Sequence, residues 1–257
     1  MWWSSLFTDM RPSDFFNFSF LPKYGVAFAR GIEYTLLLAV VSVLLAVIPA
    51  LLLALMRLSK VKPVKWLSGA YIAVFRSTPM LVQLSIIYFG LFYAISLPRV
   101  SLFGFVDISR FIPGVVALAL NSSAYVAEIF RAGILAVDKG QTEAARSLGL
   151  SEGQTMVKIV LPQAVRNILP ALGNEFIMML KETSLASTFF LGDIMTSYLV
   201  VKGVSYLTLE PLTIVAIIYL CVTYPLSKVV EKFGKKMANP NSYGARKRNN
   251  LHTKGNI

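Results

Sequence analysis

Long apolar runs recur along this chain and separate its polar stretches. A helix needs about 20 mostly apolar residues to cross a bilayer, because hydrocarbon offers the backbone no hydrogen-bond partners. Residues 34–56 contain no charge and form the clearest of these runs. The pattern predicts five membrane-spanning helices, at residues 34–56, 77–98, 111–130, 168–191 and 209–227.

Basic residues are distributed unequally between the segments that flank these spans. An odd number of spans places the two termini on opposite sides of the membrane, and Lys and Arg accumulate in cytoplasmic segments. The segments after the first, third and fifth spans carry 17 Lys and Arg residues, whereas the segments on the other side carry 6. This difference predicts an N-terminus outside the cell and a C-terminus in the cytoplasm.

The composition excludes several classes of protein. Hydrophobic residues make up 56% of the chain and charged residues 15%, against roughly 45–50% and about 25% in soluble domains. A soluble enzyme, a disordered protein and a secreted disulfide scaffold are therefore excluded. The net charge of +12 is explained by the basic segments that flank the spans of a membrane protein. Nucleic acid is therefore not an expected partner. One cysteine and one histidine leave no credible metal site, and we expect the chain to bind no metal or cofactor.

The two ends of the chain differ from its apolar centre. Residues 1–24 are rich in Trp and Phe, whose rings favour the membrane–water interface, so an interfacial segment is expected there. Residues 25–230 hold the predicted spans and form the expected transmembrane domain. Residues 231–257 are polar and basic, and we expect a disordered cytoplasmic tail whose cations contact anionic membrane lipids.

The predicted cytoplasmic loop 131–167 is too long to be a simple connection. Residues 141–149 contain good helix formers and end in Gly149, which predicts a short helix with a glycine stop. Ser151 and Gln154 have the spacing of a capping box, which predicts a second helix over 155–160. Pro162 and Pro170 predict a break or kink at the entry into the fourth span. These helices could lie on the membrane or dock a soluble partner.

The same loop resembles the cytoplasmic signature of ABC importer permeases in residue type, spacing and position. The residues that match are Glu143, Ala144, Ala145, Gly149, Ile159, Leu161 and Pro162. In that family the loop forms coupling helices that sit in a groove of the ATP-hydrolysing subunit. The resemblance implies that residues 141–162 couple this chain to a separate ATPase.

A wider resemblance covers residues 25–230. The segments 75–79 (FRSTP), 121–128 (NSSAYVAE) and 181–185 (KETSL) are similar to the polar amino-acid branch of these permeases, which serves histidine, glutamine, arginine and cystine uptake. The resemblance implies an all-α integral membrane protein with the five-helix type I ABC importer permease fold. It also implies a location in the bacterial plasma membrane.

The resemblance further implies a multi-subunit importer that works by alternating access. Its other parts would be two ABC ATPase subunits, an extracellular or periplasmic amino-acid-binding protein, and a second permease, either another copy or a relative. The chain lacks a G-x-x-x-x-G-K-[ST] phosphate loop, so ATP and Mg²⁺ are expected on the partner ATPase. We therefore expect a transport subunit and not an enzyme.

Polar residues inside the spans are candidate functional residues, because a charge at membrane depth is costly. They fall into three stripes at helical spacing, one each on the second, third and fourth spans. The candidates for the substrate path are Gln83, Asn121, Tyr125, Glu175 and Glu182. The candidates for ion pairs within the membrane are Arg76, Glu128 and Lys181. The same residues could instead hold the helices together by hydrogen bonds.

Two other classes of function remain as alternatives. A secondary, ion-coupled amino-acid transporter would carry its own ion site and usually an internal repeat, and no repeat is evident here. A membrane-embedded enzyme would need a catalytic cluster. Cys221 lies in the last span and His252 in the polar tail, so they form no credible nucleophile–base arrangement.

Overall fold

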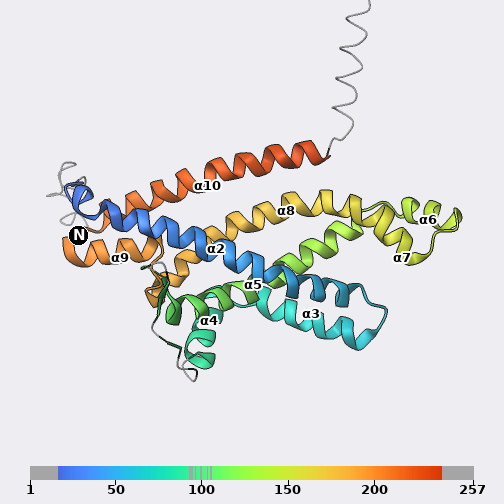
Figure 1. Ribbon diagram of the computed structural model, residues 1–257, viewed down its shortest axis with the longest axis horizontal. Helices are drawn as coiled ribbons and strands as arrows, with labels where there is room; N and C mark the ends of the chain where they lie inside the picture. Colours follow the sequence, from blue (N-terminus) through green and yellow to red (C-terminus); the bar gives the residue numbers. More distant parts are fainter. Residues whose placement is uncertain are drawn as a thin grey trace, which may run out of the picture.

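The computed structural model describes residues 17–92, 95, 97–98, 100–102, 104 and 106–238. This part of the chain is helical apart from a small hairpin in which β1 (Ser101–Leu102) pairs antiparallel with β2 (Val106–Asp107). Figure 1 shows an elongated bundle, with α6 and α7 at one end and α9 and the start of α2 at the other.

The first long helix, α2 (Leu21–Leu58), has 38 residues and extends about 57 Å, more than a bilayer requires. It begins well before the predicted start at residue 34, and the expected domain boundary at 24 lies inside it. The early start has a tertiary cause. Phe28 near the beginning of α2 packs in a cluster with Ile194, Tyr198 and Val201, and this burial supports helix outside the uncharged run.

The prediction of a second span at 77–98 is wrong. Helix α3 (Lys62–Ser77) ends at Ser77, and α4 (Met80–Ser85) with the π-helical segment η2 (Ile86–Leu91) leaves at an angle of 106°. The break lies at Thr78, which is extended because a following proline disfavours the helical conformation. From Met80 to Leu91 the helix extends only about 18 Å, so any second span must include α3.

Helix α5 (Ile108–Leu135) lies at the centre of the bundle, where it packs against α2 and α8 (Leu161–Glu182) (Figure 1). Its first turn is capped by Asp107, whose carboxylate accepts hydrogen bonds from the backbone N–H and the hydroxyl of Ser109. Many of its buried residues are Ala, Gly or Ser, which allow neighbouring helices to approach closely. Helix α5 contains the predicted third span.

After α5 the chain forms α6 (Lys139–Ser147) and then α7 (Glu152–Thr155), which starts with the predicted capping box. The predicted second helix over 155–160 is helical in the structure, but its bounds differ: it starts at Glu152, and the π-helical segment η3 (Met156–Val160) joins α7 to α8 without a break. Pro162 is the second residue of α8 and directly follows the π-helical turn, so it does not end the helical run. Pro170 does not end the helix either, and it packs beside Gly234.

The last segments are the 3₁₀ helix η4 (Thr183–Phe189), α9 (Ile194–Ser205) and α10 (Leu209–Ala238). Helix α10 continues past residue 231, so the first part of the expected disordered tail is helical. Residues 239–257 and 1–16 lie outside the described residues. Among the described helices, α2, α5 and α10 are each long and apolar enough to cross a membrane. Five spans result if the bent pairs α3–α4 and α8–α9 each count as one.

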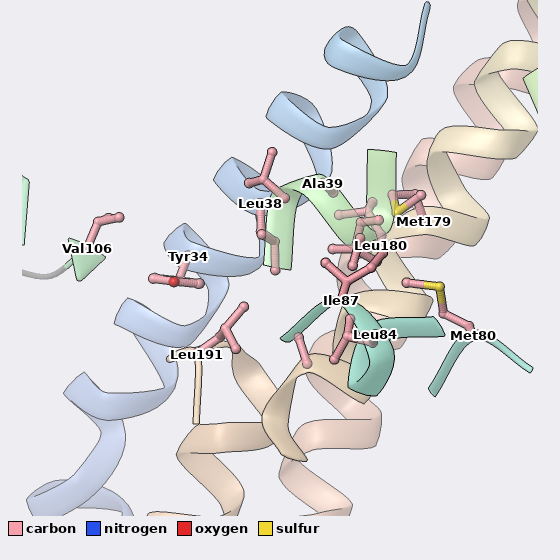
Figure 2. Close-up of a cluster of buried hydrophobic side chains, with 14 residues drawn as sticks. Tyr34, Leu38, Ala39, Met80, Leu84, Ile87, Val106, Met179, Leu180 and Leu191 are labelled. Atoms are coloured by element: carbon pink, nitrogen blue, oxygen red, sulfur yellow. The ribbon is translucent and has the colours of Figure 1, made fainter. Parts of the chain in front are cut away.

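The largest hydrophobic core lies where α2, α4, α5, α8 and η4 meet. Figure 2 shows Tyr34 and Leu38 of α2 in this region, with Leu84 of α4 and Leu180 of α8 farther along the same cluster. The ring of Tyr34 meets the edge of Phe111 with a centroid separation of 5.6 Å. This core packs α4 and η2 against the central helix α5.

Helices α2 and α9 approach each other closely at Gly31. The hydroxyl of Ser197 donates to the carbonyl of Ala27 at 2.9 Å, and the Thr35 hydroxyl accepts from the backbone N–H of Ile194 at 3.1 Å. A Cβ at Gly31 would lie 2.6 Å from Ser197 Oγ and 3.0 Å from Ile194 Cα. Only glycine fits here, because the second of these contacts is with backbone.

Candidate functional site

The loop helix α6 is closed at both ends by local hydrogen bonds. The Asp138 side chain accepts from the backbone N–H of Gly140 at 2.6 Å. At the other end, Gly149 has a φ of +84° and donates its N–H to the carbonyl of Arg146 at 3.0 Å. A left-handed residue that ends a helix is usually glycine. The glycine of the signature therefore fixes the shape of this loop.

The signature residues of α6 divide into an inner and an outer face. Ala145 is buried, with 5% of its surface exposed, whereas Glu143 and Ala144 are exposed. Leu148 is 82% exposed and lies four residues after Ala144, so the two share the outer side. Sequence reasoning missed Leu148, although its helical spacing from Ala144 was a usable signal. An exposed leucine beside an alanine offers a partner a small apolar patch.

The second half of the signature lies beneath α6, at the start of α8. Helix α6 packs against η3, where Val160 is buried in a cluster with Val137, Ala164 and Ile168. Leu161 and Pro162 are exposed, and Ile159 is half-buried. The fold thus brings the two halves of the signature together in one end of the bundle (Figure 1).

Gln83 and Asn121, two candidates for the substrate path, are hydrogen-bonded to each other. The Asn121 side chain, 3% exposed, donates to Gln83 Oε1 at 2.7 Å. Gln83 Nε2 in turn donates to the carbonyl of Phe75 at 2.8 Å and to the carbonyl and hydroxyl of Thr78. These bonds satisfy backbone carbonyls that the break after α3 leaves free. The pair joins the break to α5.

Arg76 and Tyr125 lie together at one end of an open groove. The Arg76 guanidinium lies over the Tyr125 ring, 5.3 Å from its centre. The expected shared stripe of Arg76 and Gln83 is not present, because the bend at Thr78 places them on different helices. The groove has a volume of about 480 Å³, and small residues of α5 and α8 form much of its wall. Its lining residues are Arg76, Tyr125, Glu128, Ile129, Ala132, Gly133, Ala136, Asn167 and Ala171.

Glu128 forms ion pairs, and its two partners were not among the candidates named from the sequence. Its carboxylate lies 2.8 Å from Arg131 Nη2, one turn along α5, and 3.7 Å from Arg57 Nε at the end of α2. In the sequence analysis, Arg57 and Arg131 were only counted among the 17 Lys and Arg residues of the cytoplasmic segments. The spacing of three between Glu128 and Arg131 was a usable signal, whereas the contact with Arg57 depends on how α2 packs against α5.

The remaining candidates lie on α8. Glu175 accepts a hydrogen bond from the Ser122 hydroxyl of α5 at 3.0 Å, and Glu182 is half-buried. Lys181 is exposed and has no ion-pair partner among the described residues, so the ion pair for which it was a candidate is not seen in this chain. The end of α8 turns Lys181 outward. The described part of the chain also holds no group of three His, Cys, Asp or Glu residues that could bind a metal.

Comparison with known proteins identifies one family. Residues 42–239 match the model of the binding-protein-dependent transport system inner membrane component. An arginine transport system permease protein of Bacillus subtilis is 43% identical over 79% of this chain and 90% of its own length. A putative glutamine transport system permease of Rickettsia typhi is 37% identical over 85% of this chain and 95% of its own.

Solved structures agree with these sequence matches. The structure of an amino acid ABC transporter with histidines superposes with a TM-score of 0.78 and 44% identity, over 86% of this chain and 99% of the matched chain. A chain of the inward-facing MetNI methionine ABC transporter matches with a TM-score of 0.65 over 82% of this chain and 96% of its own. At 17% identity, the second match shows a common fold alone.

Proposed function

This chain belongs to the family of binding-protein-dependent transport system inner membrane components, and from that premise we propose that it is the permease subunit of an ATP-driven importer for a polar amino acid. The relatives named for arginine, glutamine and cystine transport support an amino acid as the substrate. The same relatives overturn the alternative of an ion-coupled secondary transporter.

One structural observation carries the coupling role. Helix α6 places the exposed Ala144 and Leu148 at the very end of the bundle, on a loop whose shape is fixed by Asp138 and Gly149. A preformed apolar patch of this kind suits docking to a soluble subunit. We propose that residues 141–162 bind the partner ATPase, which holds the ATP and Mg²⁺.

The unequal distribution of Lys and Arg supports an orientation with α6 and the C-terminus in the cytoplasm and the N-terminus outside. In this orientation α9 and the start of α2 lie at the outer surface (Figure 1). That end would receive the amino acid from an external binding protein. The bacterial relatives support the bacterial plasma membrane as the location.

The open groove between α5 and α8 supports a second permease subunit, a copy or a relative. Its small residues permit close helix approach, and its wall includes Arg76 and Tyr125, whose polar groups suit a substrate path better than lipid. We propose that two permeases enclose the path and two ATPases drive it by alternating access. Each subunit then supplies half of the translocation pathway.

Within this path, Tyr125, Glu175 and Glu182 are the proposed substrate contacts. The Glu175 carboxylate accepts one hydrogen bond from Ser122 and can accept others. This free acceptor capacity suits the ammonium group of an amino acid. The side chains of Gln83 and Asn121 are hydrogen-bonded to each other, and Gln83 also binds backbone carbonyls at the break after α3. We therefore assign them to holding the wall of the path rather than to binding the substrate.

Reconstitution tests the proposed function directly. The full chain is placed in proteoliposomes with its ATPase and its binding protein, and uptake of labelled amino acids is measured with ATP on the ATPase side. We expect uptake with ATP and none with a non-hydrolysable ATP analogue. Uptake by the permease alone, driven by a proton or sodium gradient, would contradict the proposal.

Replacement of Glu175 tests the substrate path. Glu175→Gln keeps the size of the side chain and an acceptor for Ser122, but it removes the negative charge. We expect the KM for uptake to rise about tenfold, because a hydrogen bond to a charged group contributes more than one between neutral groups. The control is Ser122→Ala, which removes the hydrogen bond and keeps the charge. Equal KM values for wild type and Glu175→Gln would contradict the role.

A further inference from the structure

A second cavity lies where the end of α2 meets the start of α3 and the end of α5. It has a volume of about 270 Å³ and is lined by Arg57, Leu58, Lys65, Arg131 and Leu135. Three of its five lining side chains are cations and the other two are leucines. None of these residues belongs to the substrate path or to the coupling segment proposed above.

The positive charge of this cavity is only partly neutralised. Glu128 is paired with both Arg57 and Arg131, so one carboxylate serves two guanidinium groups. Lys65 has no ion-pair partner within the described residues. The Arg57 Nε is buried without a hydrogen-bond partner. Three cations against one anion leave a surplus that an anionic ligand would balance.

The position of Arg57 is set by the fold. Its Nη1 lies 3.0 Å from where a Cβ of Gly69 would be, so the guanidinium rests against the backbone of α3 at its glycine. Arg131 is held by its two hydrogen bonds to Glu128, at 3.0 Å and 2.8 Å. The two arginines are therefore oriented before any ligand arrives, which lowers the entropy lost on binding.

Trp66 places this cavity at the level of the lipid headgroups. Its side chain is 75% exposed on α3, directly after Lys65, and the following Leu67 and the N-cap residue Val61 are exposed as well. Exposed tryptophan with apolar neighbours is typical of the membrane–water interface. Toward the membrane centre, α2 presents the exposed side chains of Leu55 and Leu52. Cations at the interface above a lipid-facing apolar surface match the shape of a phospholipid.

We propose that the cavity formed by Arg57, Lys65 and Arg131 binds the phosphate headgroup of an anionic phospholipid. Lys65 and the free donors of the arginines contact the phosphate, and the acyl chains follow the leucines of α2. A zwitterionic lipid offers the same phosphate, but it also carries a cation, which the surplus positive charge of the cavity would repel. The inference needs only a chain that spans a membrane and is independent of the transported substrate.

Fluorescence quenching at Trp66 tests this site. Trp66 is one of three tryptophans, so Trp2→Phe and Trp3→Phe leave it as the sole reporter in the full chain. This protein is reconstituted into vesicles that contain brominated phosphatidylglycerol among phosphatidylcholine, or the reverse. We expect brominated phosphatidylglycerol to quench Trp66 more strongly at equal mole fraction. Lys65→Gln should weaken this preference about fivefold.

A matched control is available on the same helix. Lys62 is an exposed lysine in the first turn of α3 and does not line the cavity. Lys62→Gln should leave the lipid preference unchanged, and Lys65→Arg should retain it. Equal quenching by both lipids, or equal loss in Lys62→Gln and Lys65→Gln, would overturn the proposal. If added inorganic phosphate abolishes the preference, the site binds a free anion, and the proposal of a lipid headgroup is overturned.

Discussion

Replacing Leu148 by glutamate is expected to reduce ATP-driven uptake about 30-fold or more while the permease remains folded in the membrane. Leu148 is exposed at the end of α6, so the change removes no contact within the described chain that the fold requires. A central apolar residue of an interface contributes about 2 kcal/mol or more, and a charge in its place adds the cost of burial. The measurements are uptake in proteoliposomes and the ATPase activity stimulated by the loaded binding protein.

The matched control for this experiment is Leu148→Met, which keeps an apolar side chain of similar volume and should keep most of the activity. Size-exclusion chromatography of the purified permease separates loss of docking from loss of folding. If Leu148→Glu supports uptake at the rate of wild type, residues 141–162 do not couple the permease to its ATPase in the way proposed.

Replacing Gly31 by valine is expected to destabilise the permease by about 3 kcal/mol, which lowers the Tm in detergent by about 10 °C. The added Cβ would collide with Ser197 Oγ and crowd the backbone at Asp193 and Ile194. A backbone cannot yield as the end of a flexible side chain can. Helices α2 and α9 would have to separate, and the hydrogen bond from Ser197 to Ala27 would break with them.

Gly25→Val is the control for this second experiment. Gly25 lies on the same helix, and its Cβ would meet no described atom within 4 Å. The two substitutions therefore make the same change of residue in the same helix and differ only in their surroundings. A Tm for Gly31→Val equal to that for Gly25→Val would show that α2 and α9 do not approach as described.

Local features of this protein could be predicted from its sequence. The capping box of Ser151 and Gln154 and the left-handed Gly149 both occur as expected, because each depends on a few neighbouring residues. The all-α fold and the regions of the first, third and fifth spans follow from long apolar runs, since any such run must pair its own backbone in lipid. The family resemblance was carried by the residues and spacing of one loop and by three short segments, 75–79, 121–128 and 181–185.

Other features depended on contacts that a linear pattern does not contain. The apolar run 77–98 indicates a helix but not the angle between helices, so the bend at Thr78 was not predicted. Pro79, which causes this bend, is present in the sequence. The hydrogen bond between Asn121 and Gln83 joins residues of two helices. Periodicity alone did not distinguish substrate contact from hydrogen bonding between helices for these two residues. The pairing of Arg57 with Glu128 required the packing of α2 on α5.

The unbroken run of helix from Glu152 to Phe189 has a mechanical consequence. It starts directly beside α6 and ends next to α9, so a single stiff rod joins the two ends of the bundle (Figure 1). In the proposed coupling, a push on α6 would tilt this rod as a whole, and a small angle at one end would become a larger displacement at the other. The π-helical turns of η3 are where such a lever would yield first, which would place its pivot next to the loop that the ATPase is proposed to move.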